Sequence, residues 1–261
     1  MAYSKIKAAV EGDVLVITLS DPGTLNAVTT DMAGEISAAI EAHASARCLV
    51  LTGEGRAFCS GANLTNVAMP IAEDGGADPG LSLEQHYNPL MTKLRDLPIP
   101  FITAVNGAAA GIGCSLALMG DLIVAGESAY FLQAFRRIGL APDGGATYLL
   151  PRMLTRVQAM EMMLLGEKLP AAKALQWGLI NRCVADGEVI STAMALASEL
   201  ARGPTKALAI TRKLAWDALD NQWSAQLNAE RWAQREAGRT SDFAEGVTAF
   251  LQKRPAQFRG N

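Results

Sequence analysis

The sequence has few cysteines and histidines, which argues against most metal-centred functions. The four cysteines and two histidines are Cys48, Cys59, Cys114, Cys183, His43 and His86. No two cysteines form a C-x-x-C pair, and no histidine spacing completes a zinc-ligand pattern. We therefore interpret the cysteines as reduced, mostly buried thiols, and we expect no metal and no tightly bound cofactor.

Charge and long apolar runs are also scarce. Charged residues make up 19% of the chain, and the net charge is -3. No basic run could follow a phosphate backbone, so we expect no nucleic-acid partner. The first 20 residues contain no apolar stretch of signal-peptide length, and no run elsewhere approaches the roughly 20 residues of a membrane span. These absences predict a soluble, cytoplasmic protein with no membrane partner.

Three nucleotide-binding or hydrolase motifs are missing. No glycine-rich loop ends in G-K-[ST], as a P-loop requires. A dinucleotide fingerprint, G-x-G-x-x-G, fails twice, because Phe58 and Leu116 stand where its third glycine should be. The G-x-S-x-G elbow is absent around Ser60 and Ser115. A serine–histidine pair built from distant residues stays open.

What is present is an alternation of strand and helix patterns. With 261 residues and 50% hydrophobic content, the chain can bury a substantial core. Apolar runs predict strands at 14–19, 47–52, 101–105 and 122–125, and helical spacing predicts a helix at 30–45. This alternation is typical of an α/β protein with a parallel sheet. After residue 155 the pattern is mostly helical, with helices expected at 160–165, 171–177, 190–201, 206–219, 223–237 and 242–253.

Residues 66–81 form a segment rich in glycine, proline and acidic residues. This composition predicts a mobile surface loop. Such a loop can serve as a lid or a substrate-binding segment, and it can equally be a plain insertion.

Two glycine-containing segments follow predicted strands and could bind an anionic oxygen. The first is FCSGANL at 58–64, in which Ser60 and its small neighbours let a ligand approach the backbone. The second is NGAAAGIGCS at 106–115, where we expect a helix to begin near Gly111 or Ile112. The first N–H groups of a helix have no internal partner. An ordinary turn and close helix packing would explain the same residues.

The segment GLAPDGGAT at 139–147 places Asp143 in a turn just before a predicted helix. An aspartate at this position is most often a helix N-cap. The residue alone therefore predicts capping, with catalysis as the alternative.

Taken together and in this order, these segments resemble the crotonase family of enoyl-CoA hydratases and isomerases. The similarity extends over nearly the whole chain. It includes LNAV at 25–28, FCSGANL with Asn63 where aspartate is usual, AVNGAAAGIGCSLALMGD at 104–121, and the closing EGVTAFLQKRPAQFRG. The resemblance implies a spiral of ββα turns at 1–200 with the active site, and a helical region at 201–261 that drives assembly of a homotrimer or a hexamer.

The resemblance also implies the site residues and the ligand. The N–H groups of Ala62 and Ile112 would form an oxyanion hole for the carbonyl of an acyl-CoA thioester, with coenzyme A entering as part of the substrate. Phe250 would lie by the adenine of a neighbouring subunit's ligand, and Lys253 near its phosphate. The full substrate-binding set is Leu25, Ala27, Ser60, Ala62, Asn63, Leu64, Phe135, Phe250 and Lys253.

The chain departs from the family where hydratases carry their two catalytic glutamates, because Ser115 and Phe135 occupy those positions. The segment at 131–152 is instead similar to the phenylacetate-pathway isomerases of the PaaG type, whose acid lies at Asp143. The resemblance therefore favours double-bond isomerisation with Asp143 as the proton shuttle, in an apolar pocket of Phe135, Ile138, Leu140 and Tyr148.

Several alternatives stay open. A two-glutamate hydratase is the nearest one. A dehalogenase of the family would need tryptophan at Phe135, and a noncatalytic relative would bind a CoA thioester or RNA. Should Asp143 not be the base, the 66–86 region offers Glu73, Asp74 or Glu84. The acyl group, the pathway and the choice between trimer and hexamer cannot be read from the residues.

Overall fold

Two β-sheets organise the chain. The computed structural model describes residues 3–63 and 70–261. The larger sheet contains, in spatial order, β1 (Ile6–Glu11), β2 (Val14–Leu19), β3 (Cys48–Gly53), β5 (Phe101–Val105), β7 (Leu122–Gly126) and β10 (Arg182–Val184). The smaller sheet contains β4 (Ala57–Cys59), β6 (Ala108–Ala110), β8 (Tyr130–Leu132) and β9 (Leu169–Pro170). Neighbours pair in parallel except β1 with β2 and β8 with β9.

The strands follow one another as a repeated ββα unit. In the pairs β3–β4, β5–β6 and β7–β8, the first strand joins the larger sheet, the second joins the smaller sheet, and a helical segment follows. The corners are tight. A Cβ atom at Gly53 would lie 2.2 Å from the carbonyl oxygen of Ala57, and one at Gly107 would lie 2.2 Å from that of Arg56. Only glycine fits so close to another backbone.

The helices surround this spiral. The longer ones before the C-terminal arm are α1 (Thr30–Ala42), α3 (Asn88–Arg95), α4 (Ile112–Leu118), α5 (Ala146–Met153), α6 (Arg156–Leu165), α7 (Ala171–Gln176) and α8 (Val189–Ala201). The short helical turns are η1 (Pro22–Thr24), α2 (Gly80–Ser82), η3 (Phe135–Ile138), η4 (Asp186–Glu188) and η2 (Leu83–Tyr87), the last a π-helical turn between α2 and α3.

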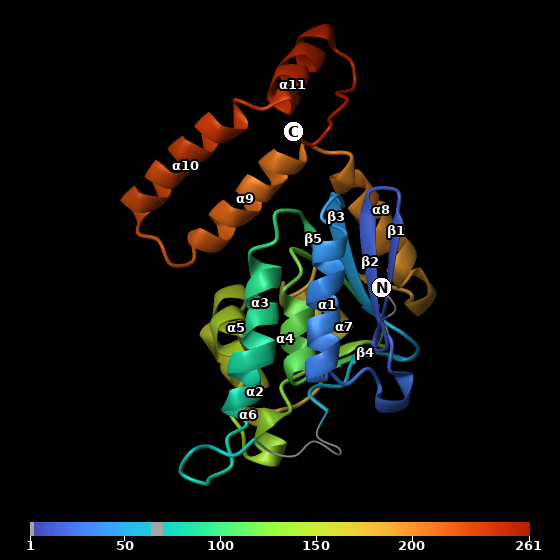
Figure 1. The fold of residues 1–261 in the computed structure, drawn as a ribbon, viewed down its shortest axis with the longest axis vertical. Helices are drawn as coiled ribbons and strands as arrows, with labels where there is room; N and C mark the ends of the chain where they lie inside the picture. The colour runs from blue at the N-terminus through green and yellow to red at the C-terminus, as the bar shows by residue number, and fades with distance from the viewer. Residues whose placement is uncertain (1–2, 64–69) are drawn as a thin grey trace.

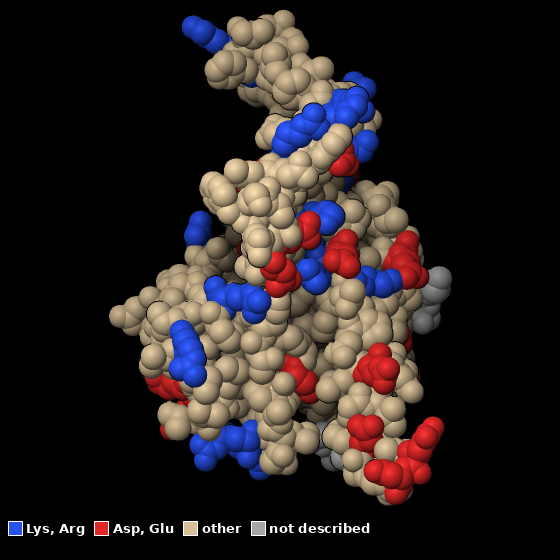
Figure 2. Space-filling view, turned by 90° about the vertical axis from the view of Figure 1, so that its left-hand side faces the viewer, with Lys and Arg blue, Asp and Glu red and all other residues tan. Residues whose placement is uncertain are grey.

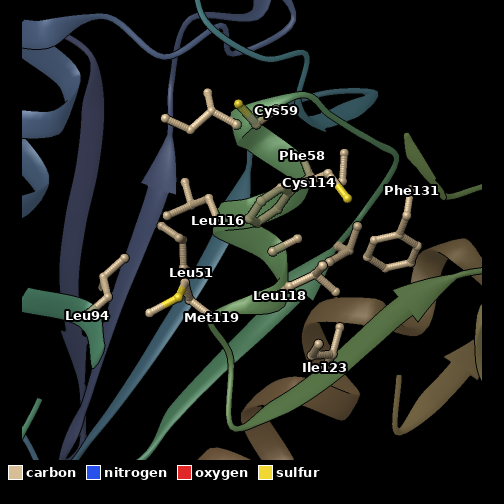
Figure 3. Close-up of a cluster of buried hydrophobic side chains, with 14 of the residues drawn as sticks. Leu51, Phe58, Cys59, Leu94, Cys114, Leu116, Leu118, Met119, Ile123 and Phe131 are labelled. Carbon is tan, nitrogen blue, oxygen red and sulfur yellow. The ribbon is translucent and has the colours of Figure 1, made fainter. Parts of the chain in front are cut away.

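The two faces of the larger sheet are both buried, which explains its apolar strands. One face packs on α8, where Val50 and Ile102 meet Ala193 and Ala197. The other face packs on the main core, which includes α1, α3 and α4. All seven residues of α4 are buried, and Figure 3 shows this helix in the middle of the cluster. The start of α4 is therefore embedded in the core.

The C-terminal helices form an arm that projects from the core. Helices α9 (Thr205–Asp217), α10 (Trp223–Ala237) and α11 (Ser241–Gln252) lie beyond α8 in Figure 1, and Figure 2 shows the molecule narrowing toward that end. The buried Arg212 anchors α9. Its guanidinium donates to Asp121 at 2.7 Å and to the carbonyl of Leu94 at 2.6 Å.

Most of the long elements agree with the sequence pattern, but strand β1 and helix α3 were not predicted. The predicted strands and the six C-terminal helices all form, within a few residues of the expected bounds. Strands β4, β6 and β8 were not predicted, because each has three residues. Ala108–Ala110 is a run of alanine, a residue that favours helix, so its pairing with β4 and β8 decides its conformation.

Candidate active site

The two backbone segments expected to bind an oxyanion lie side by side. Strands β4 and β6 pair in parallel, with Cys59 opposite Ala109. Ala62 and Ile112 each lie three residues beyond this pair. The approach is close, since a Cβ atom at Gly111 would lie 3.7 Å from the Cα of Gly61.

Among the described residues, no hydrogen-bond acceptor is recorded for the amides of Ala62 and Ile112. Ala62 forms a parallel bridge with Val28, in which the N–H groups of Val28 and Asn63 donate and that of Ala62 does not. Ile112 is the first residue of α4, so its N–H has no acceptor within the helix. Within the described ranges, neither amide has a backbone acceptor. Both are thus available to a ligand oxygen.

The LNAV segment is fixed against the first of these loops by a buried amide. Leu25 and Asn26 have φ angles of 56° and 58°, a left-handed conformation that is costly for leucine and better tolerated by asparagine. The fully buried Asn26 side chain compensates, because its Nδ2 donates to the carbonyls of Glu54 and Ala57. Ser60 in turn donates to the carbonyl of Leu25 through its N–H, at 3.0 Å.

Most of the predicted substrate-binding residues are therefore neighbours. Leu25, Ala27 and Ser60 lie on these two adjoining segments with Ala62, and the Ser60 hydroxyl donates to the carbonyl of Thr24 at 2.8 Å. Asn63 follows directly and donates its N–H to the carbonyl of Val28. Leu64 lies outside the described residues, as do residues 66–69 of the expected loop.

The turn that carries Asp143 packs on the first turn of α4. Gly144 has a φ angle of 59°, and a Cβ atom there would lie 2.9 Å from the Cβ of Ser115 and 3.0 Å from Cγ1 of Ile112. The buried Ser115 hydroxyl donates to the main-chain carbonyl of Asp143 at 2.8 Å. Asp143 and the Ile112 amide are consequently positioned by the same contact.

Asp143 is half-buried, and one of its two carboxylate oxygens is buried without a partner. The Oδ1 atom has no hydrogen-bond partner in the part of the chain that the structure describes. Burial raises the pKa of this carboxyl from its usual 3.8 to about 6, because the charged form loses water. The expected capping role is wrong. Helix α5 begins after Gly145 with no side-chain cap, since Gly145 itself takes the capping position with a φ angle of 81°.

Tyr87 is a site residue that the sequence analysis did not identify. Its hydroxyl donates to the carbonyl of Val28 at 3.2 Å, the same carbonyl that accepts the N–H of Asn63. Burial and the nearby charges of Asp143 and Cys59 raise the pKa of the Tyr87 phenol. It ends the π-helical turn η2, and such turns are frequent at functional sites. A π turn leaves no clear sequence signal.

The positions of the two hydratase glutamates hold no carboxylate. The Ser115 hydroxyl donates to the main-chain carbonyl of Asp143, and Phe135 is buried with its ring near Gly111. The expected apolar pocket of four residues is not formed within the chain. Ile138 and Leu140 are exposed, and Tyr148 donates its hydroxyl to Asp220 at 2.9 Å.

Other candidate groups are exposed or distant. Glu73, Asp74 and Glu84 are all exposed, as is His86. His43 ends α1, with its ring against the carbonyl of Ala39. The described part of the 66–81 segment contains a short bridge between residues 71 and 77 and then continues into α2. No serine–histidine pair forms in the described part of the chain.

Phe250 and Lys253 are not brought to this site by their own chain. Both lie at the end of α11, which is at one end of the longest axis in Figure 1, far from β4. The Phe250 side chain is 83% exposed, so the alternative of a buried helix face is wrong. Lys253 is in the left-handed conformation, with a φ angle of 53°.

Two further properties bear on the chemistry. Among residues 3–63 and 70–261, no three histidine, cysteine or acidic side chains are grouped as metal ligands would be. In the same ranges no helix combines the length and apolar character that a bilayer span requires. The four cysteines are free, and Cys48, Cys59 and Cys114 are buried, as expected.

Comparison with known proteins identifies relatives of full length. The family model for enoyl-CoA hydratase/isomerase matches residues 9–261. A probable enoyl-CoA hydratase of Rhodobacter capsulatus is 44% identical over 265 residues, covering 100% of both chains. The 1,2-epoxyphenylacetyl-CoA isomerase of Escherichia coli is 44% identical over 259 residues, covering 98% of both.

Solved structures agree with these matches. An enoyl-CoA hydratase from Polaromonas sp. JS666 superposes with a TM-score of 0.88 at 35% identity, covering 97% of this chain and 99% of the other. An enoyl-CoA hydratase from Bacillus anthracis has a TM-score of 0.90 at 26% identity, covering 99% and 100%. The ββα spiral with its helical arm is thus the crotonase fold, and the chain belongs to the enoyl-CoA hydratase/isomerase family.

Proposed function

We propose that this enzyme moves a double bond within an acyl-CoA thioester, with Asp143 as the single proton shuttle. The observation that carries this proposal is the buried, unpaired Oδ1 of Asp143 beside the first turn of α4. A carboxyl with a pKa of about 6 is ionised at neutral pH and is a stronger base than an exposed aspartate. The absence of carboxylates at Ser115 and Phe135 supports isomerisation over the addition of water.

In this proposal the amides of Ala62 and Ile112 hold the thioester oxygen. Their two N–H groups donate to the oxygen as negative charge develops on it, which lowers the barrier to enolate formation. Both are main-chain groups on backbone that the sheet pairing fixes, so they need little reorganisation during the reaction. A site of this kind contributes most in the transition state, where the charge is largest.

The proton transfer conserves atoms. With a 3-enoyl-CoA, Asp143 removes a proton from C2, and the electron pair moves through the conjugated system to the thioester oxygen. The resulting dienolate takes the same proton back from Asp143 at C4. The double bond then lies between C2 and C3, and the carboxylate is regenerated without water or a second acid.

The relatives leave two further substrates open. The name of the E. coli relative supports a ring epoxide of phenylacetyl-CoA as a second candidate, since the same enolate chemistry would serve it. The name of the Rhodobacter relative supports hydration of an enoyl-CoA. Hydration requires that one carboxylate and the main-chain amides suffice to position and activate water.

The decisive experiment compares two reactions on the same preparation. We expect rapid isomerisation of a 3-enoyl-CoA and slow hydration of crotonyl-CoA, followed by absorbance of the conjugated thioester. Asp143→Asn should lower kcat for isomerisation by at least about 10²-fold. Activity of the unmodified enzyme should also fall as the pH drops through about 6, because the base becomes protonated.

Three outcomes would contradict the proposal. Fast hydration without isomerisation would favour the hydratase. Full activity in Asp143→Asn would point to another base, with Glu84→Gln as the matched test of an exposed carboxylate on the adjacent helical segment. Tight binding of CoA thioesters without any turnover would indicate a noncatalytic relative. The mixed charges on the face in Figure 2 do not favour an RNA-binding relative.

We further propose that residues 201–261 drive assembly of a trimer or a hexamer. The arm exposes large apolar side chains that a lone chain would leave in water, including Trp223 at 77% and Trp232 at 51% exposure. In such an assembly Phe250 and Lys253 would contact the coenzyme A of a neighbouring subunit. Light scattering gives the mass, and a monomer at micromolar concentration would contradict the assembly.

The buried free cysteines suit the reducing cytoplasm.

A further inference from the structure

Ser115 occupies a position at which its side chain reaches the candidate base from the neighbouring element. It is fully buried on α4, one helical turn after Ile112. Its Oγ donates to the main-chain oxygen of Asp143 at 2.8 Å. This bond joins two segments 28 residues apart, and it ties the base to the element that begins with the Ile112 amide.

The packing around this bond leaves the turn little room to move. A Cβ atom at Gly144 would overlap both Ser115 and Ile112, so the turn already lies in contact with α4. The next residue, Gly145, also has a positive φ, at 81°. A turn with two left-handed glycines has many conformations when free, so a specific bond is needed to select one.

We propose that Ser115 is a positioning residue that fastens the Asp143 turn to α4 and so sets the carboxylate against the Ile112 amide. The inference rests on the proposed function, in which these two groups act on the same substrate. Where a hydratase would place a glutamate, this chain uses a small hydroxyl that acts on the backbone instead. The residue is therefore part of the geometry of the base and not a proton donor.

The surroundings of Asp143 make the effect of Ser115 measurable by titration. Helix α4 carries no charged side chain. On α5, Tyr148 and Arg152 both bond to Asp220 of the arm. Tyr87 is the titratable side chain whose pKa responds to Asp143. A turn released from α4 gains access to water, so its carboxyl should return toward the ordinary pKa of an aspartate.

The experiment compares Ser115→Ala with Thr103→Val. Thr103 is a matched control, because its buried hydroxyl donates to the Ala117 carbonyl of the same helix at 2.7 Å but does not reach the turn. We expect Ser115→Ala to lower kcat about tenfold with KM changed less than about twofold, and to move the acidic limb of the pH profile to lower pH. Thr103→Val should lose thermal stability only. Ser115→Cys, a weak donor of similar size, should be intermediate.

A second pair of variants decides the matter if Ser115→Ala folds poorly. Gly144→Ala forces the turn off α4, whereas Gly139→Ala places a methyl group in open space at a similar φ of 72°. The proposal predicts the kinetic and pH effects in the first variant and not in the second. A wild-type pH profile in both Ser115→Ala and Gly144→Ala would overturn it.

The failure of this inference can be separated from that of the proposed function. The carboxyl carbon of Asp143 can be titrated by NMR in Ser115→Ala, which reports on position without any turnover. An unchanged titration together with an inactive Asp143→Asn would refute the role of Ser115 alone. An active Asp143→Asn would refute the proposed function, whatever the titration shows.

Discussion

The Asp143 carboxylate is ionised at neutral pH at a cost in folding free energy. Its pKa is 3.8 in an unfolded chain and about 6 in the folded protein, because burial removes water from the charge. Between these values the folded state binds a proton that the unfolded state has released. Raising the pH through this window therefore lowers the free energy of unfolding. The burial that makes this carboxylate a stronger base also lowers the stability of the folded protein at neutral pH.

We predict that Asp143→Asn stabilises the protein at neutral pH and not in acid. The amide keeps the shape of the side chain and cannot ionise. The gain in unfolding free energy should grow by about 1 to 3 kcal/mol between about pH 4 and about pH 7.5. Urea unfolding at both pH values measures it, with Glu84→Gln as a control that removes an exposed negative charge. An equal effect at both pH values would contradict the buried, ionised carboxylate.

Tyr87 supplies a second prediction at this scale. Its hydroxyl donates to the Val28 carbonyl. The same carbonyl accepts the N–H of Asn63, the residue after Ala62. Tyr87→Phe should cost about 1 kcal/mol of stability and lower kcat several-fold, because a buried hydrogen bond is lost and the loop relaxes. Thermal unfolding and kinetics test both effects. Tyr130→Phe is the control, on a half-buried tyrosine whose ring lies under Lys168. Similar kinetics in the two variants would remove Tyr87 from the site.

At the scale of elements, the β4–β6 pairing places the two segments that carry these amides next to each other. A side-chain substitution at Ala62 or Ile112 leaves the N–H in place, so the pairing itself must be disturbed to test the oxyanion site. Gly61 offers this possibility. It has a φ angle of 113°, and a Cβ atom there would lie 3.1 Å from the carbonyl oxygen of Ala110.

We predict that Gly61→Ala separates the two segments and lowers kcat/KM by about 10² to 10³, the typical effect of one lost oxyanion donor. Gly12→Ala is the matched control, because Gly12 has a φ angle of 62° in the β1–β2 turn with nothing within 4 Å of its Cβ position. It should cost about 1 kcal/mol of stability and leave the kinetics unchanged. Equal catalytic losses in both variants would indicate general strain.

At the scale of the whole molecule, the active site and the end of the arm lie far apart in one chain. If assembly brings Phe250 of one subunit to the ligand of another, its effect should depend on the adenine. We predict that Phe250→Ala raises KM about tenfold for a CoA thioester and leaves KM unchanged for the corresponding pantetheine thioester. Leu251→Ala, an equally exposed neighbour on α11, is the control. A rise for both substrates would place Phe250 elsewhere.

The sequence by itself determined most of the long elements, the order of the motifs and the family. These follow from apolar periodicity and from residues close together in the chain, such as those at 58–64 and 106–115. The strands of three residues could not be predicted, because pairing between distant segments stabilises them. The sequence shows the glycine at each corner. It does not show which backbone segment that glycine allows to come close.

Only the tertiary structure decided the environment of Asp143. Its neighbours in the sequence predict a helix cap, yet Gly145 takes that place, and the buried Oδ1 of Asp143 has no partner among the described residues. Its pKa, its bond to Ser115 and the proximity of Tyr87 all depend on residues tens of positions away. Burial and solvent exclusion arise from the packing of α4 and η2 around the turn. Local propensity carries no information about them.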